Sequence, residues 1–226
     1  HYGYSPNGQI IDNDIRFNQG FDQTVLGGGH GGGILVAGHE QEIGAAISQS
    51  VGSGSVRIAR NRIQGNQAGS GDGGGILLSS VNGQDVLQFG NRNRWHAIEI
   101  LNNFVVNNVA GNRGGAIAMQ DALSVTIANN TIANNDSTAT AADALTPDLN
   151  SSEPRPAGVV LYAPSLTLLN GLNNGQRNRV TDVASNPVLV NDIIVGNRSH
   201  TWQSVSVGGN PPGQFSGTLT QVGVSD

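Results

Sequence analysis

A repeated pattern of apolar and asparagine positions runs along this chain. In the stretch SVTIANNTIANN, from Ser124 to Asn135, isoleucines occupy the first and sixth positions of a frame, and asparagines occupy the fourth and ninth. The spacing occurs five times, as Ile10/Asn13/Ile15/Asn18, Ile58/Asn61/Ile63/Asn66, Ile100/Asn103/Val105/Asn108, Ile127/Asn130/Ile132/Asn135 and Leu189/Asp192/Ile194/Asn197. Self-similarity at a fixed internal spacing indicates a repeat architecture, in which each repeat packs on its neighbours.

A glycine-rich element follows four of the five frames. Its copies are Gly31-Gly32-Gly33-Ile34, Gly73-Gly74-Gly75-Ile76, Gly114-Gly115-Ala116-Ile117 and Ala157-Gly158-Val159. The apolar run after the first copy reads as a short buried strand, and the glycines are expected at a tight corner where a Cβ would clash. The frames that begin at Ile100 and Ile127 are only 27 residues apart (127 − 100). This spacing sets the length of a bare coil, and the other coils carry surface insertions.

The frame itself explains why such a coil would form. Its two apolar residues would point inward from short parallel strands, which favour isoleucine and valine. Asparagine suits the bend that follows, because it tolerates a left-handed backbone. Stacked coils lie about 4.8 Å apart, so each side-chain amide would bond to the next. We therefore predict two asparagine ladders, the first of Asn13, Asn61, Asn103 and Asn130, and the second of Asn18, Asn66, Asn108, Asn135 and Asn197.

Charges in the first two frames test this register. When the frames are aligned on their leading isoleucines, Asp12 matches Arg60 and Asp14 matches Arg62. If the two frames occupy adjacent coils, each pair should lie within side-chain reach, because neighbouring strands are close.

The segments between the frames are expected to lie at the surface. Residues 39–55 have some apolar content and would add a further strand or a short helix, whereas 79–96, 136–157 and 163–187 are predicted to be exposed loops. We treat 1–226 as a single segment. Because neither end carries a capping sequence, we expect it to be part of a longer parent chain. The remainder of that chain, or a neighbouring subunit, would cover the terminal coils.

Composition excludes several functions. The net charge is -5, all 11 basic residues are arginine, and they form no basic stripe, so we expect no nucleic-acid partner. The chain has no cysteine, which excludes disulfides and thiolate metal sites. No run approaches the roughly 18 apolar residues of a membrane span. A β-rich chain with neither cysteine nor lysine and with many glycines and asparagines is typical of secreted bacterial surface proteins, although the absence of cysteine alone would also fit a cytosolic protein.

The frame and the GGGI element together resemble the right-handed parallel β-helix repeats of the pectin-lyase-like superfamily, from Gln9 to about Asn197. The stretches 130–140 and 186–198 are similar to the β-helix portion of very large secreted bacterial proteins, some of which also carry cupredoxin or multicopper-oxidase domains. The resemblance implies an all-β fold, a right-handed parallel β-helix (solenoid) of about five coils with irregular loop insertions. It also implies a secreted or cell-surface location in a bacterium, with the chemistry elsewhere in the parent chain.

An enzymatic role is the alternative. Pectate lyases and polygalacturonases of this fold use clustered aspartates with Ca²⁺ and an arginine base, or a pair of carboxylates for hydrolysis. Here no Asp-Asp pair occurs, and the positions that match Asp12 are Arg60, Asn102, Asn129 and Asn191. We therefore expect a structural or interaction scaffold that is not catalytic by itself. A carbohydrate-active lyase or hydrolase, and the scaffold part of a copper-dependent oxidase, remain the alternatives.

Two histidines are the candidates for a metal site. His39 and His96 both lie in loops that lead from a glycine-preceded strand to the next frame, so both would reach one side of the coils. Glu40 could complete the site, with Glu42 or Asp85 as further ligands. The alternative is that both histidines are solvated loop residues. No cofactor is expected, and Ca²⁺ or Cu²⁺ are the ions that such a site would take.

Overall fold

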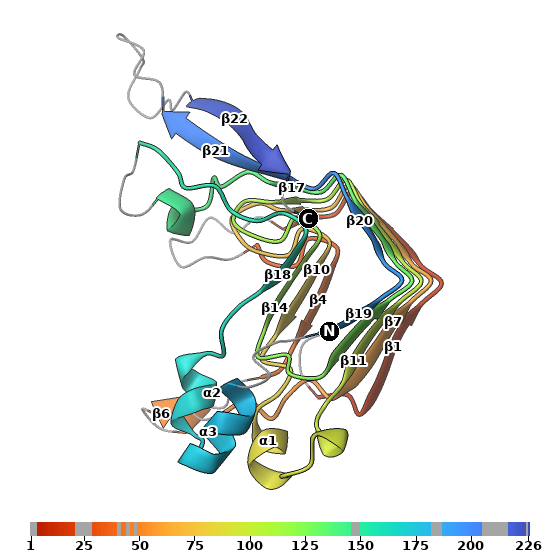
Figure 1. Ribbon diagram of the computed structural model, residues 1–226, viewed down its shortest axis with the longest axis vertical. Helices are drawn as coiled ribbons and strands as arrows, with labels where there is room; N and C mark the ends of the chain where they lie inside the picture. The colour runs from red at the N-terminus through yellow and green to blue at the C-terminus, as the bar shows by residue number, and fades with distance from the viewer. Residues whose placement is uncertain are drawn as a thin grey trace.

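The computed structural model describes residues 4–20, 29–39, 42–43, 46–47, 49–145, 150–181, 187–204, 217–224 and 226. The chain is predominantly β, with 41% strand and 13% helix, and its strands form four mostly parallel sheets. The chain passes through these sheets in turn, and we call one such passage a coil. Strands of successive coils lie one behind another (Figure 1), an arrangement compatible with a parallel β-helix.

The two halves of each frame form the first two sheets. The first sheet has the order β1 (Asn7–Ile11), β7 (Ser55–Ala59), β11 (Ile98–Leu101), β15 (Val125–Ala128) and β19 (Val188–Val190). The second has the order β2 (Asp14–Arg16), β8 (Arg62–Gln64), β12 (Phe104–Val106), β16 (Thr131–Ala133) and β20 (Ile193–Val195). All neighbours in both sheets are parallel.

Two further sheets complete the coils. The third contains β3 (Gln19–Gly20), β9 (Gln67–Ala68), β13 (Val109–Ala110), β17 (Asp136–Ser137), β21 (Arg198–Ser204) and β22 (Gly217–Val224), the last pairing antiparallel with β21. The fourth contains β4 (Ile34–Ala37), β10 (Ile76–Ser79), β14 (Ile117–Gln120) and β18 (Val159–Leu161). The glycine-rich elements thus precede the fourth sheet, as predicted.

The strand register confirms the frame alignment. Ile10 pairs with Ile58, Ile58 with Ile100, and Ile100 with Ile127, whose other partner is Leu189. The second apolar position continues in the same way from Ile15 to Ile194. These side chains fill one continuous core with those of the fourth sheet, except that Leu189 in the last coil is 46% exposed. The isoleucines of the three central frames are fully buried.

The frame asparagines form two hydrogen-bonded ladders. In the first, each Nδ2 donates to the Oδ1 of the next coil, from Asn13 through Asn61, Asn103 and Asn130 to Asp192, at 2.9–3.0 Å. In the second, the bonds run from Asn18 through Asn66, Asn108, Asn135 and Asn197 to Asp226, at 2.8–3.0 Å. The backbone N–H of each asparagine donates to the same oxygen. Buried amides are thereby satisfied along the molecule.

The left-handed backbone conformation does not occur at the ladder asparagines, where we predicted it. The bend is made by the residue before each ladder asparagine, with φ of 59° at Asp12, 55° at Arg60 and 56° at Asn102, whereas no ladder asparagine has a positive φ. The ladder residue instead uses its amide to bond the adjacent coils. The two roles that we assigned to one asparagine are therefore divided between neighbouring residues.

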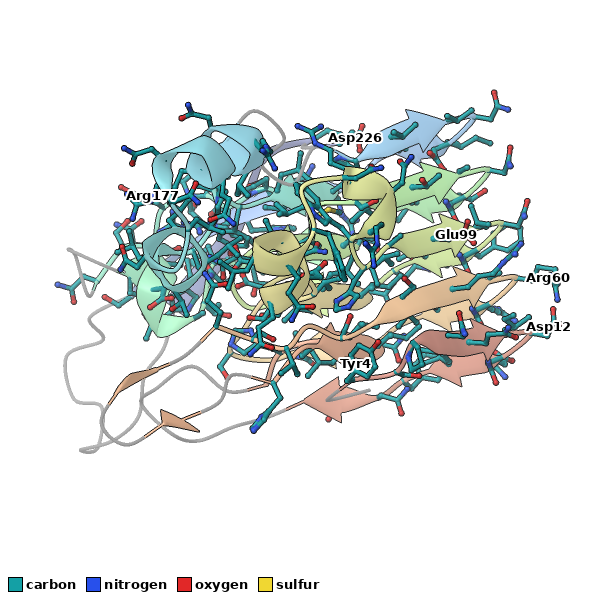
Figure 2. All side chains as sticks on the ribbon, turned by 90° about the horizontal axis from the view of Figure 1, so that it is seen from below. Tyr4, Asp12, Arg60, Glu99, Arg177 and Asp226 are labelled. Carbon is teal, nitrogen blue, oxygen red and sulfur yellow. The ribbon has the colours of Figure 1, made fainter. Side chains whose placement is uncertain are left out.

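The two charge pairs behave differently. Arg60 donates to both carboxylate oxygens of Asp12 at 2.7 Å, and both residues lie at the same edge of the molecule (Figure 2). Asp14 is aligned with Arg62 in adjacent strands, which confirms the register. Their side chains choose other partners, however, because Asp14 pairs with Arg16 at 2.7 Å and Arg62 donates to Gln64. At an exposed surface such alternatives differ little in free energy.

Both ladders end on a carboxylate, and the first ends with an unpaired oxygen. Asp192 Oδ1 accepts from Asn130, whereas Asp192 Oδ2 is buried and has no hydrogen-bond partner among the described residues. In earlier coils, the side-chain atom at the position of Asp192 Oδ2 is an amide nitrogen. It donates to the backbone carbonyl of the first apolar residue in the preceding frame, as Asn130 Nδ2 donates to Ile100. The equivalent acceptor for position 192 is the carbonyl of Ile127.

Replacing this aspartate should therefore stabilise the protein. We expect Asp192→Asn to raise the free energy of unfolding by about 1 kcal/mol, because its amide would donate to the unused carbonyl. Urea unfolding measures the change, and the exposed Asp143→Asn serves as a control that should leave the midpoint unchanged. A lower midpoint for Asp192→Asn would contradict the ladder geometry.

The segments between the frames form structure of their own. Residues 39–55 include an antiparallel hairpin of β5 (Glu42–Ile43) and β6 (Ala46–Ile47), and two 3₁₀ turns lie at Arg92–Arg94 and Ala142–Leu145. Helices α1 (Gln84–Gln88), α2 (Leu166–Asn170) and α3 (Asn174–Thr181) gather at one corner (Figure 1). We expected 79–96 and 163–187 to be exposed loops. Instead, 79–96 and 163–181 pack together there on a second apolar cluster of Val86, Trp95, Leu123, Leu168, Leu172 and Val180.

Among the residues that the structure describes, no helix is both long and apolar enough to cross a membrane.

Candidate functional site

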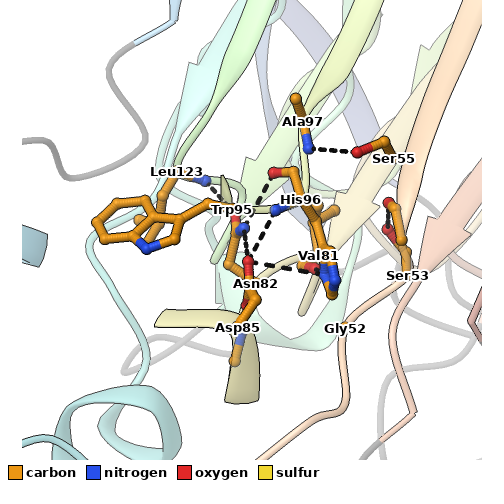
Figure 3. Close-up of polar contacts among 12 residues, drawn as sticks. Gly52, Ser53, Ser55, Val81, Asn82, Asp85, Trp95, His96, Ala97 and Leu123 are labelled. Carbon is orange, nitrogen blue, oxygen red and sulfur yellow. Dashed lines mark hydrogen bonds and ion pairs between the residues drawn. The ribbon is translucent and has the colours of Figure 1, made fainter. Parts of the chain in front are cut away.

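The candidate site is centred on a buried carboxylate at the base of α1. Asp85 is 3% exposed and accepts three hydrogen bonds, from Asn82 Nδ2 at 2.7 Å, from the Gly83 backbone at 2.7 Å and from the His96 backbone at 2.8 Å. Asn82 is also buried, and its Oδ1 accepts from the backbone of Leu123 in the next coil. These contacts, drawn in Figure 3, close the loop between β10 and β11 and fix the position of His96.

The ring of His96 is held from three sides. Its Nδ1 lies 3.1 Å from the carbonyl oxygen of Val81, which can only accept, so Nδ1 carries a proton. The Asp85 carboxylate is 3.7 Å from the same nitrogen, and the ring of Tyr4 meets the imidazole edge to face at 5.5 Å. The imidazole also packs against Gly52, where an added Cβ would lie 2.2 Å from Nδ1. In the neutral form of this ring, Nε2 is the acceptor nitrogen, as in a general base or a metal ligand.

A shallow groove runs beside this loop on the outer face of the first sheet. Its volume is about 260 Å³, and its lining includes Ser55, Arg57, Ala97 and Glu99. The Ala97 backbone, next to His96, donates to Ser55, so the groove begins at the histidine loop. Arg57 and Glu99 are half-exposed and 3.7 Å apart. One carboxylate neutralised by an arginine does not provide the acid and base pair that glycoside hydrolysis requires.

The predicted metal site is only partly described. His39 is exposed, and its backbone carbonyl accepts a hydrogen bond from the backbone N–H of Val51. Val51 precedes Gly52, which packs against the His96 ring, so the two histidine loops lie on the same side of the coils. Glu40 lies outside the described residues. Within the part of the chain that the structure describes, no three His, Cys, Asp or Glu side chains come together as a metal ion would require. The site with Glu40 stays a prediction.

A second polar group lies at the corner between the third and fourth sheets. The Arg113 guanidinium lies over the Tyr162 ring at 5.1 Å, and the Arg113 backbone donates to Asp72 at 3.0 Å. Burial, reinforced by the nearby negative charge of Asp72, raises the pKa of Tyr162 far above its usual value. A phenol in this environment stays protonated at neutral pH, so it cannot act as a base.

A third polar group surrounds a small cavity between the coils and α2. It contains Gln49 and Asp121, both buried, and Asp121 accepts a hydrogen bond from the Ser165 backbone at 2.8 Å. Burial raises the pKa of Asp121, and the hydrogen bonds from Ser165 oppose that shift. Sequence analysis missed this group, because its members are distant in the chain and lie outside the repeated frame.

No family model, curated protein or solved structure matches this chain. The site therefore has to be interpreted from its own geometry.

Proposed function

We propose that this chain is a right-handed parallel β-helix of the pectin-lyase-like type and a non-catalytic scaffold of a secreted or cell-surface bacterial protein. Its last coil is the interaction surface, covered by a β-segment of a neighbouring subunit or of further parent chain. In the isolated chain, the available neighbour is a second copy.

The exposed edge of the last coil carries this proposal. β19 and β20 lie at the ends of their sheets, and their outward side chains Val188, Val190, Ile193 and Val195 are 45–60% exposed. In the first coil, the corresponding face of β2 carries the charged Asp14 and Arg16. Natural edge strands are usually protected by charges, so an uncharged β-branched edge favours pairing with another chain.

The polarity of the first ladder disfavours head-to-tail stacking of two copies. Along the ladder, each side chain donates to the oxygen of the following coil. A head-to-tail neighbour would place the Oδ1 of its Asn13 in the acceptor position beyond Asp192. A carboxylate has no proton to donate there, so two acceptors would meet, which is unfavourable in a buried contact. Head-to-tail stacking would therefore leave this ladder contact unsatisfied.

Sedimentation equilibrium of the purified chain tests this proposal. We expect the average mass to rise with concentration, and Ile193→Lys to keep the chain monomeric, because a lysine at the edge opposes strand pairing. Phe104→Lys is the matched control, since Phe104 is equally exposed on the same face but lies within the sheet, and it should associate like the wild type. A wild-type chain that stays monomeric at every concentration would refute the interaction surface.

The enzymatic alternative has one observation in its favour, the groove beside His96. We expect no turnover of pectic or other acidic polysaccharides with Ca²⁺, and no phenol oxidation with Cu²⁺, because the groove has a single, ion-paired carboxylate. Activity that is lost in both His39→Ala and His96→Ala variants would overturn the non-catalytic assignment.

A further inference from the structure

A small cavity lies where four separate segments meet. The loop before β7 contributes Gln49, the corners after β10 and β14 contribute Ser80 and Asp121, and the start of α2 contributes Ser165. The volume of the cavity is about 10 Å³. This is enough for one water-sized sphere and no more.

One hydrogen-bond acceptor in the lining of the cavity is unsatisfied among the described residues. Gln49 is 8% exposed, and its amide nitrogen donates to the Leu168 carbonyl at 2.6 Å. Its Oε1 is buried and has no hydrogen-bond partner among the described residues. The Ser80 carbonyl accepts from the Ser50 hydroxyl, and the Ser165 hydroxyl accepts from the Leu168 backbone. An occupant that supplies a proton or positive charge would satisfy Gln49 Oε1.

The electrostatics favour positive charge. Asp121 is 4% exposed, and no ion pair in the described part of the chain includes it. A second buried carboxylate, Asp85, is connected to it through Asn82, whose backbone donates to the Asp121 carbonyl and whose side chain donates to Asp85. Asp85 accepts three hydrogen bonds and lies 3.7 Å from the His96 ring, whereas Asp121 is a buried carboxylate with no cationic side chain beside it among the residues that the structure describes. Such a carboxylate is expensive to desolvate unless hydrogen bonds or a cation compensate it.

We propose that this cavity binds a single monatomic cation between the Asp121 carboxylate and Gln49 Oε1. The donor set consists of oxygens, which hard cations such as Ca²⁺ prefer. Mg²⁺ keeps several of its waters, and the cavity has no room for them. The ion fastens α2, and with it the second apolar cluster, to the coils.

Thermal unfolding at constant ionic strength tests this site, with tetramethylammonium chloride as the baseline and Ca²⁺, Na⁺, K⁺ or Mg²⁺ as probes. We expect Ca²⁺, or Na⁺ if a monovalent ion is preferred, to raise the midpoint by roughly 5–10 °C at one hundred times its dissociation constant, and Mg²⁺ to have little effect. Asp121→Asn should lose this response, whereas the exposed Asp143→Asn should keep it.

Equilibrium dialysis provides a readout that does not depend on stability. We expect one bound ion per wild-type chain and weaker binding by Gln49→Leu. This second variant keeps the Asp121 carboxylate, so it tests the site even if Asp121→Asn fails to fold. A wild-type midpoint that none of the cations shifts would show that the cavity holds water only and would overturn the proposal. An equal response in the wild type, Asp121→Asn and Gln49→Leu would also overturn it, because the ion would then bind elsewhere.

Discussion

Gly74→Ala should strongly destabilise the protein, because the added methyl group would meet the backbone of the next coil. A Cβ at Gly74 would lie 2.5 Å from the carbonyl oxygens of both Gly115 and Val109. Both oxygens belong to the backbone of the next coil, and that of Gly115 accepts a hydrogen bond from Gly75 at 3.0 Å, so neither can withdraw without breaking the coil stack. We expect a loss of about 3 kcal/mol or more in the free energy of unfolding, at the upper end for overpacking.

Urea unfolding of Gly74→Ala and Gly175→Ala makes the comparison. Gly175 lies in α3, and a Cβ there would only touch Asn173 Oδ1 at 3.6 Å. Alanine should therefore be neutral or stabilise that helix by roughly 0.5–1 kcal/mol. Similar midpoints for the two variants would contradict the close approach of neighbouring coils at the glycine corner.

Asn103→Leu should be the second most damaging change. Asn103 Oδ1 accepts from the backbone and the side-chain nitrogen of Asn61, at 2.9 and 3.0 Å, and its Nδ2 donates to Asn130 and to the Ile58 carbonyl, both at 3.0 Å. Leucine has a similar size but removes all four bonds and leaves a buried backbone N–H without an acceptor. The expected loss is on the order of 3 kcal/mol.

Asn13→Leu is the control for the ladder. Asn13 is at the open first coil and is exposed, so water can replace its partners, and the expected loss is below about 1 kcal/mol. Equal thermal and urea midpoints for Asn103→Leu and the wild type would show that the ladder does not stabilise the coils.

The repeated frame made the sheets predictable, because every frame residue has an equivalent directly above or below it. From Ile10 to Leu189, the spacing alone placed five strands in register. The partner of Asp14 was not predictable, since a neighbour on the same strand competes with the aligned Arg62 at an exposed surface. The left-handed position was also missed, because Asp12 and Arg60 share a conformation but no chemical property that would identify it.

The insertions could not be predicted in this way. Trp95 and Leu168 belong to different coils and have no counterpart in the other repeats, so nothing in the spacing indicates that they share one apolar cluster. The cavity lined by Gln49, Asp121 and Ser165 lies where separate insertions and corners of the chain meet. Non-repeated segments are placed by tertiary packing, and only the structure shows which of them meet.

Hydrogen exchange of the wild-type chain at increasing protein concentration tests the central claim most directly, namely that the last coil is an interaction surface. If the exposed edges of β19 and β20 pair with a second copy, amides in 188–195 should become more protected as concentration rises. Amides of β11 and β12, which already lie within their sheets, should not change. Exchange in 188–195 that is the same at every concentration would contradict the claim.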